Sequence, residues 1–236
     1  MERARHAESD VPLRPPGLHE ERLTRAGSPP VGYALDVPRG YTREARVPLV
    51  LALHYGGEPF RGHGRGVVEA LVAPALAGLG AVIVAPDALA RDWGARVNEE
   101  AAMGLLDAVA AVYNVDRGRV VVTGFSMGGA GSWVYAARHA GVFSAALPVA
   151  GAPGPPPRRG EAPWRVPVFA VGSRRDTVMP VAPTVEAVEG LRRAGVRAEV
   201  VVLEDPPHYD VAAHVGGLAR AVPWLQELWR TSGAVL

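Results

Sequence analysis

Apolar residues along this chain fall into two kinds of segment that alternate. Short runs rich in β-branched residues predict strands, and longer alanine-rich stretches predict helices. The predicted strands cover residues 22–26, 32–37, 48–54, 81–86, 120–124, 145–149, 166–171 and 198–203. The predicted helices cover residues 66–78, 99–113, 128–139, 184–194 and 215–229.

The order of these segments predicts how the sheet is built. Strand and helix alternate from about residue 48 to residue 229, which is typical of a parallel sheet with helices on both faces. The later strands are continuous apolar runs, as expected for strands that are buried on both faces. The first two strands have no helix between them, so they are expected to form an antiparallel hairpin at one edge. The fold class is therefore α/β, with a mostly parallel sheet of eight strands.

A single domain accounts for almost the whole chain. A length of 236 residues fits one α/β unit and is enough to bury a substantial core. Residues 1–19 carry several prolines among mixed charges and are expected to be a mobile arm, which leaves 20–236 as one domain. The Pro/Gly/Arg-rich stretch 151–163 is too short to form a helical cap domain over the sheet.

Composition excludes several classes of protein. The chain has no cysteine, which removes disulfides and cysteine nucleophiles, and its net charge of +1 gives no basic excess for nucleic acid. The longest apolar runs, 47–53 and 81–85, are far shorter than the ~20 residues that span a bilayer. The N-terminal residues are charged and lack an apolar core, so no signal peptide is predicted and the expected location is cytoplasmic.

The strongest chemical signal is a G-x-S-x-G motif at residues 124–128, centred on Ser126. An apolar strand precedes it and an alanine-rich helix follows, as in a nucleophile elbow. The tight turn pushes the serine hydroxyl away from the sheet, and it leaves room only for glycine at positions 124 and 128. A glycine-rich phosphate loop is the alternative, but that motif needs a lysine and the chain has none.

A serine hydroxyl needs a general base, and in this fold type the order is serine, acid, histidine. Of the seven histidines, His208 and His214 lie far enough downstream, and His208 is favoured because it directly follows the last predicted strand. Asp176 follows the preceding strand and is the expected acid that orients the imidazole. Carboxylates nearer to His208 in sequence, such as Asp210, are the competing candidates.

Two backbone amides are expected to bind the negative oxygen of the reaction intermediate, at an oxyanion hole. The Met127 N–H starts the helix after the serine, and the second donor is expected to be Tyr55 or Gly56, in the loop after residues 48–54. The two tryptophans Trp93 and Trp133 are candidate walls of the substrate cleft. No metal and no cofactor are expected.

The residues from 47 to 208 resemble the α/β-hydrolase superfamily. The resemblance rests on residues 51–57, 113–129, 148–151 and 172–180 together with His208. Within the superfamily the chain is similar to the predicted-peptidase, phospholipase/carboxylesterase and feruloyl/polyhydroxybutyrate esterase-like group. The resemblance implies an α/β-hydrolase fold without a large cap, and it places the group's serine, acid and histidine at Ser126, Asp176 and His208. Many members of the group read His-Gly at the oxyanion loop, where this chain has Tyr55 after the histidine.

These observations predict a serine carboxylesterase that cleaves short-chain, soluble esters through an acyl-enzyme. Without a large insertion between residues 150 and 166 the cleft is expected to be open, which favours small soluble substrates. The expected partner is a small-molecule ester, with no nucleic acid and no membrane, and the oligomeric state is left open. A peptidase or thioesterase with the same triad is the nearest alternative, and a non-catalytic binding protein that retains the fold is the more distant one.

Overall fold

A computed structural model describes residues 11–25, 27–59, 61–154 and 164–232 of the chain. Their central feature is an eight-stranded sheet with the order β1-β2-β4-β3-β5-β6-β7-β8. The strands are β1 Gly17–Leu23, β2 Val31–Val37, β3 Val47–Leu53, β4 Val82–Pro86, β5 Val115–Phe125, β6 Ala145–Val149, β7 Val168–Ser173 and β8 Ala198–Leu203. The predicted α/β class and the mostly parallel sheet are confirmed.

Pairing within the sheet follows from the connections between strands. The β1–β2 hairpin is antiparallel, and β2 also runs antiparallel to β4, so the predicted edge hairpin is confirmed. From β4 to β8 every neighbouring pair is parallel. Parallel neighbours need a crossover connection, which returns the chain from the carboxyl end of one strand to the amino end of the next.

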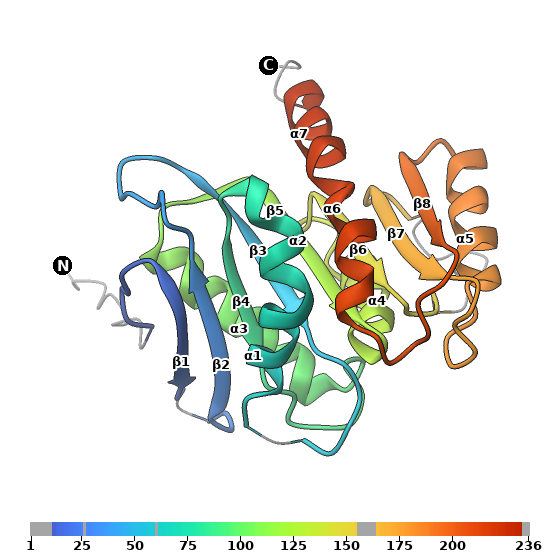
Figure 1. Ribbon diagram of the computed structural model, residues 1–236. Coiled ribbons are helices and arrows are strands. Elements are labelled where there is room, and N and C mark those ends of the chain that lie inside the picture. Colours follow the sequence, from blue (N-terminus) through green and yellow to red (C-terminus); the bar gives the residue numbers. More distant parts are fainter. Residues whose placement is uncertain (1–10, 26, 60, 155–163, 233–236) are drawn as a thin grey trace.

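Side chains alternate between two cores because successive residues of a strand point to opposite faces. In β3, Leu49, Leu51 and Leu53 pack into one apolar cluster, whereas Val50 and Ala52 pack into the other. All seven residues of β3 are buried, as the continuous apolar run 47–53 predicted for a strand covered on both faces. The sheet therefore separates two helical layers (Figure 1).

Helices cover both faces. One layer contains α1 His63–Val67, a π-helical turn Val68–Val72, α2 Ala73–Leu76, a 3₁₀ turn Ala77–Leu79, α6 Val215–Ala219 and α7 Ala221–Ser232. The other contains α3 Arg96–Val112, α4 Met127–Arg138 and α5 Ala182–Arg193. Figure 1 shows α2 and α6 on one side of the sheet and α3 and α4 on the other.

Two of the predicted helices are interrupted in the structure. The segment predicted at 215–229 divides into α6 and α7 around Arg220, because Pro223 has no N–H to donate and its ring clashes with the preceding turn. Pro74 has the same effect on the segment predicted at 66–78, where a π-helical turn precedes α2. The amino-acid pattern located both segments, but proline chemistry divides them.

The predicted N-terminal arm is packed over its described part. Residues 1–10 lie outside the described residues, but Val11 is buried in a core cluster and β1 begins at Gly17. Arg14 donates its backbone N–H to the Tyr113 hydroxyl over 2.8 Å. The first strand thus occupies Gly17–Leu23 rather than the expected 22–26, and residues 11–19 belong to the domain.

The carboxyl ends of the parallel strands lie together at the lower side of the view in Figure 1. The loops that leave β3, β4, β5, β7 and β8 at this edge carry all the candidate catalytic residues. Ligand sites of open α/β sheets are usually found here. Among the described helices, none combines the length and apolar character needed to cross a membrane.

Candidate active site

Ser126 occupies the sharp turn between β5, which ends at Phe125, and α4, which begins at Met127. Its backbone has φ 56° and ψ −115°, a conformation that costs a non-glycine residue roughly 1–3 kcal/mol. Two hydrogen bonds hold this turn, from Ser126 N–H to the Val149 carbonyl (3.0 Å) and from Ala130 N–H to the Ser126 carbonyl (2.9 Å). The geometry is that of a nucleophile elbow.

Glycines on either side of Ser126 let the backbone pass close to neighbouring carbonyls. A Cβ at Gly128 would lie 1.9 Å from the Leu53 carbonyl oxygen, and one at Gly124 would lie 2.4 Å from the Gly128 carbonyl oxygen. No side chain fits at these distances, so the motif requires glycine at both positions, as the steric argument from the sequence predicted.

A third close approach joins α4 to the end of β6. A Cβ at Gly129 would lie 2.4 Å from the Val149 carbonyl oxygen, and one at Gly151 would lie 2.5 Å from the Gly129 Cα. Ala150, between them, has a positive φ of 45°. The backbone of α4 therefore rests directly against the backbone that leaves β6, on one flank of Ser126.

The structure brings His208 to the serine. The Ser126 Oγ lies 2.7 Å from His208 Nε2, although 82 residues separate them in sequence. His208 is 4% exposed, in the loop that follows β8, and Asp210 N–H donates to the Pro207 carbonyl within this loop. An imidazole at this distance can accept the hydroxyl proton.

The third predicted residue, Asp176, completes a continuous chain of hydrogen bonds. His208 Nδ1 donates to Asp176 Oδ2 over 2.7 Å, so Nε2 is left to face the serine. The other carboxylate oxygen, Oδ1, accepts from the backbone N–H groups of Val178 (2.9 Å) and Met179 (2.7 Å). These bonds fix the orientation of a carboxylate that is almost fully buried.

The competing residues lie elsewhere. Asp210 Oδ1 accepts from Ala213 N–H, away from the imidazole of His208. His214 is buried, donates Nδ1–H to the Asp210 carbonyl (2.9 Å) and packs edge-on against Phe125. Burial lowers the pKa of His214, so the neutral ring is favoured. His214 therefore supports the loop of His208 and does not contact Ser126.

The expected oxyanion donors lie on two adjacent segments. Met127 is the first residue of α4, where the N–H groups are not used within the helix. Gly56 lies beside it, since a Cβ at Gly56 would meet the Met127 Cβ at 3.8 Å. Tyr55 directs its hydroxyl toward Gly66 in α1, and its carbonyl accepts a hydrogen bond from His54.

The two candidate cleft tryptophans are buried. Trp93 is 1% exposed and donates Nε1–H to the His54 carbonyl (2.9 Å); Trp133 is 3% exposed and donates to the Gly151 carbonyl (3.2 Å). Both rings hold backbone near the site, so their expected contact with substrate stays a prediction. Trp133 lies in α4 and Trp93 in the turn before α3, and each ring packs in the core with its N–H bonded to a backbone carbonyl.

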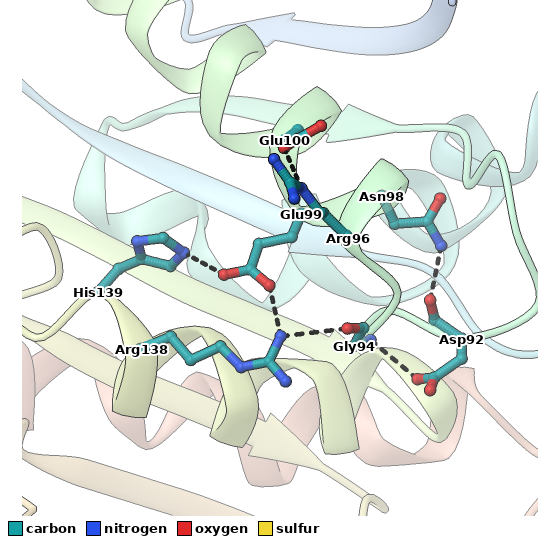
Figure 2. A network of polar contacts seen from close by, with 8 residues as sticks. All are labelled: Asp92, Gly94, Arg96, Asn98, Glu99, Glu100, Arg138 and His139. Atoms are coloured by element: carbon teal, nitrogen blue, oxygen red, sulfur yellow. Dashed lines mark hydrogen bonds and ion pairs between the residues drawn. The ribbon is translucent and has the colours of Figure 1, made fainter.

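Sequence reasoning missed the residues that hold the loop after β4. Asn98 is buried, accepts from the Leu89 and Ala90 N–H groups and donates to the Ala90 and Asp92 carbonyls. Figure 2 shows this residue beside a second group, in which Glu99 of α3 binds His139 and Arg138 at the end of α4. An asparagine directly before the helix predicted at 99–113 was the only signal in the sequence.

A pocket of about 340 Å³ lies between the β1–β2 hairpin and the loop after β4. The residues around it include Arg22, Arg61 and Asp87, and it adjoins the His54–Ala88 contact. Both oxygens of Asp87 accept backbone N–H groups, from Gly62 and Gly64. Within the described ranges, no three His, Asp or Glu side chains gather where they could hold a metal ion.

Comparison with known proteins identifies a family. Residues 64–214, more than half of the chain, match the dienelactone hydrolase family. Among curated proteins, none matches this sequence. The candidate triad residues Ser126, Asp176 and His208 all fall within the matched range.

Solved structures of hydrolases share the fold. A thermostable esterase is 21% identical with a TM-score of 0.72; the match covers 89% of this chain but 62% of the esterase, so this chain spans less than two thirds of its length. A ferulic acid esterase is 21% identical, with a TM-score of 0.67 and coverage of 90% and 98%. An S-formylglutathione hydrolase from Agrobacterium tumefaciens is 14% identical, with a TM-score of 0.66 and coverage of 90% and 94%.

Proposed function

The chain belongs to the dienelactone hydrolase family of the α/β-hydrolase superfamily. We propose that it is a carboxylesterase-type hydrolase that cleaves short-chain, soluble esters through an acyl-enzyme on Ser126. One observation supports the proposal above the others. Ser126, His208 and Asp176 come from three separate loops and form one unbroken line of hydrogen bonds, each 2.7 Å long. A purely structural serine has no need of an imidazole that is itself oriented by a buried carboxylate.

The first half of the reaction builds the acyl-enzyme. Ser126 Oγ attacks the ester carbonyl while His208 Nε2 takes the hydroxyl proton. Asp176 stabilises the imidazolium that forms, because its carboxylate faces Nδ1–H. The negative charge on the former carbonyl oxygen is bound by backbone N–H groups, one of them from Met127. His208 then returns its proton to the departing alcohol.

The second half releases the acid. A water molecule enters the position of the alcohol, and His208 accepts one of its protons as it attacks the acyl carbon. The tetrahedral intermediate again places its oxygen at the same amides; as it collapses, the bond from the acyl carbon to Ser126 Oγ breaks and His208 returns its proton to Oγ, which restores the hydroxyl. No step requires a metal ion or cofactor to balance atoms or charge.

The substrate part of the proposal rests on the short connection after β6. The chain passes from β6 to β7 with residues 150–167, which is too little for a helical cap. Residues 155–163 of this connection lie outside the described residues. An uncapped site favours small soluble esters over long acyl chains that need an enclosed apolar channel.

The test uses a fluorophosphonate probe and a set of nitrophenyl esters from acetate to decanoate, with a thioester and a peptide anilide alongside. We expect the probe to label Ser126, activity to be highest on the short esters, and Ser126→Ala to lower kcat about a million-fold. Ser132→Ala is the matched control, since Ser132 is a buried serine whose hydroxyl donates to the Gly128 carbonyl. Labelling of Ser126 by the probe should be unchanged in the Ser132→Ala variant.

Each outcome decides a separate part of the proposal. An unlabelled Ser126 together with ester hydrolysis that survives Ser126→Ala would overturn the nucleophile. If activity is highest on the decanoate ester, the proposed preference for short acyl chains is wrong, but the proposed mechanism is unaffected. Faster turnover of the thioester or the anilide would identify the enzyme as a thioesterase or a peptidase with this triad.

A further inference from the structure

We propose that His54 is a positioning residue of the oxyanion hole, which holds the Tyr55 carbonyl so that the Gly56 N–H becomes the second donor beside Met127. The inference rests on the proposed function and deepens it, because it names the donor and the side chain that aims it. His54 lies immediately after β3, two residues before Gly56.

Both ring nitrogens of His54 are engaged by backbone groups. Nε2 lies 3.0 Å from the Ala88 N–H and Nδ1 lies 2.6 Å from the Tyr55 carbonyl oxygen. The Ala88 amide can only donate, so Nε2 must present its lone pair. The proton is therefore on Nδ1 and is donated to Tyr55, which defines the tautomer of a neutral ring.

This bond sets the direction of the next amide. The described peptide bonds are all trans, and in a trans peptide the C=O and the following N–H point in opposite directions. Because the Tyr55 carbonyl faces the imidazole, the Gly56 N–H points away from it. Among the described residues, no protein acceptor bonds to this N–H, and a Cβ at Gly56 would lie 3.8 Å from the Met127 Cβ.

The same reasoning excludes Tyr55 as the donor. The carbonyl of His54 accepts the Trp93 Nε1–H and lies on the α4 side, since a Cβ at Gly128 would be 2.7 Å from its oxygen. The N–H of Tyr55 belongs to that same peptide and points the opposite way, away from the first turn of α4. An oxyanion bound by Met127 is thus within reach of Gly56 and not of Tyr55.

The surroundings of His54 keep it neutral. It is 1% exposed, and burial lowers its pKa to about 4. The titratable groups that face it act in opposite directions, since His63, with its ring 4.8 Å away, lowers the pKa and Asp87 raises it. A protonated ring would place an N–H against the Ala88 N–H, so the arrangement requires the neutral form.

The experiment compares replacements at position 54 in the full chain. His54→Phe keeps a ring and removes both hydrogen bonds, and we expect kcat to fall about a hundredfold, as for loss of an oxyanion donor, with KM changed less than threefold. His54→Asn restores a donor near the position of Nδ1 and should recover about tenfold of the loss in kcat. His54→Gln places its amide near Nε2 and should recover less.

A transition-state analogue separates positioning from general damage. A trifluoromethyl ketone forms a tetrahedral adduct with the serine, so its affinity should fall in parallel with kcat across the three variants. His139→Asn, a change at the distant end of α4, is the control and should leave kcat and this affinity unchanged. Thermal unfolding checks that each variant is folded.

The outcomes decide the inference without reopening the proposed function, because labelling and ester hydrolysis by the unaltered chain are measured first. A folded His54→Phe with kcat within threefold of the unaltered chain, or with a loss confined to KM, overturns it. If His54→Phe does not fold, the comparison of His54→Asn with His54→Gln decides the inference. In that case equal kcat values for His54→Asn and His54→Gln overturn the inference.

Discussion

His208 and His54 are both buried at the same edge of the sheet, and both ring nitrogens of each are hydrogen-bonded. Their partners differ. His208 lies between a hydroxyl and a carboxylate, whereas His54 lies between a backbone N–H and a backbone carbonyl. A carboxylate stabilises an imidazolium, and an N–H donor excludes one. Burial alone therefore does not distinguish a general base from a positioning residue, whereas the chemistry of the hydrogen-bond partners does.

The difference also explains why the two rings suit their proposed tasks. A general base must gain and lose a proton in each half-reaction, which Asp176 makes possible by balancing the charge. A residue that aims an amide must not change its charge at working pH, and His54 meets this requirement through its surroundings. Three changes test this contrast at different strengths.

The largest effect is expected where the charge balance of His208 is removed. Asp176→Asn keeps an acceptor for the Val178 and Met179 amides but offers an N–H to His208 Nδ1, which favours the wrong tautomer. We expect kcat to fall about 10⁴-fold with the fold retained, measured by steady-state ester hydrolysis. Asp210→Asn is the matched control, and a loss of less than tenfold in Asp176→Asn would contradict the role of the carboxylate.

An intermediate effect is expected on stability in acid. Burial lowers the pKa of His54 from its ordinary value of 6.5 to about 4, so between these values the unfolded chain binds a proton that the native chain does not. The free energy of unfolding should therefore decrease as pH falls from 6.5 to 4, by roughly 3 kcal/mol from this residue. Above pH 6.5 the contribution is constant.

Urea unfolding at several pH values measures this slope. His54→Asn has no titrating ring, so its unfolding free energy should decrease less steeply than that of the unaltered chain. His214 adds a slope of the same sign in both proteins, because burial lowers its pKa too. Identical slopes for the two proteins would show that folding does not lower the pKa of His54.

The smallest effect is expected at His139, a third histidine, which pairs with a carboxylate but does not contact Ser126. Glu99 of α3 binds His139, the residue that follows α4, and also binds Arg138, as Figure 2 shows. These groups are partly exposed, so Glu99→Gln should lower the unfolding free energy by about 1 kcal/mol or less and leave kcat unchanged. A loss of activity would mean that the α3–α4 contact positions the elbow, and His139→Asn would then have to reproduce it.

Much of the site could be predicted because its residues lie at strand ends. Ser126, Asp176 and His208 each follow an apolar run in the sequence, and parallel strands bring their carboxyl ends to one edge. The predicted strand and helix order is confirmed for the same reason, since apolar runs are periodic and local. Where the triad residues meet follows from topology, without knowledge of any side-chain conformation.

The remaining features depend on contacts that the sequence does not state. Whether Tyr55 or Gly56 donates depends on which way a peptide is turned, and that is decided by His54 and Trp93 from different loops. Trp93 could line a cleft or fill the space beside Gly131, and only the packing of α4 distinguishes them. The first strand was placed too late because residues 11–19 hold three prolines and a glycine, which are typical of irregular chain, yet Val11 and Arg14 pack against the domain.

The contact between Gly129 and Gly151 limits how this enzyme can be modified. On that flank of the nucleophile, main chain meets main chain, so there is no side chain to trim and no methyl group to delete. Attempts to admit bulkier acids by mutagenesis must therefore act on the other side of β5, through the loops that follow β3 and β4. Libraries directed at residues 129 and 151 should yield misfolded protein instead of altered selectivity.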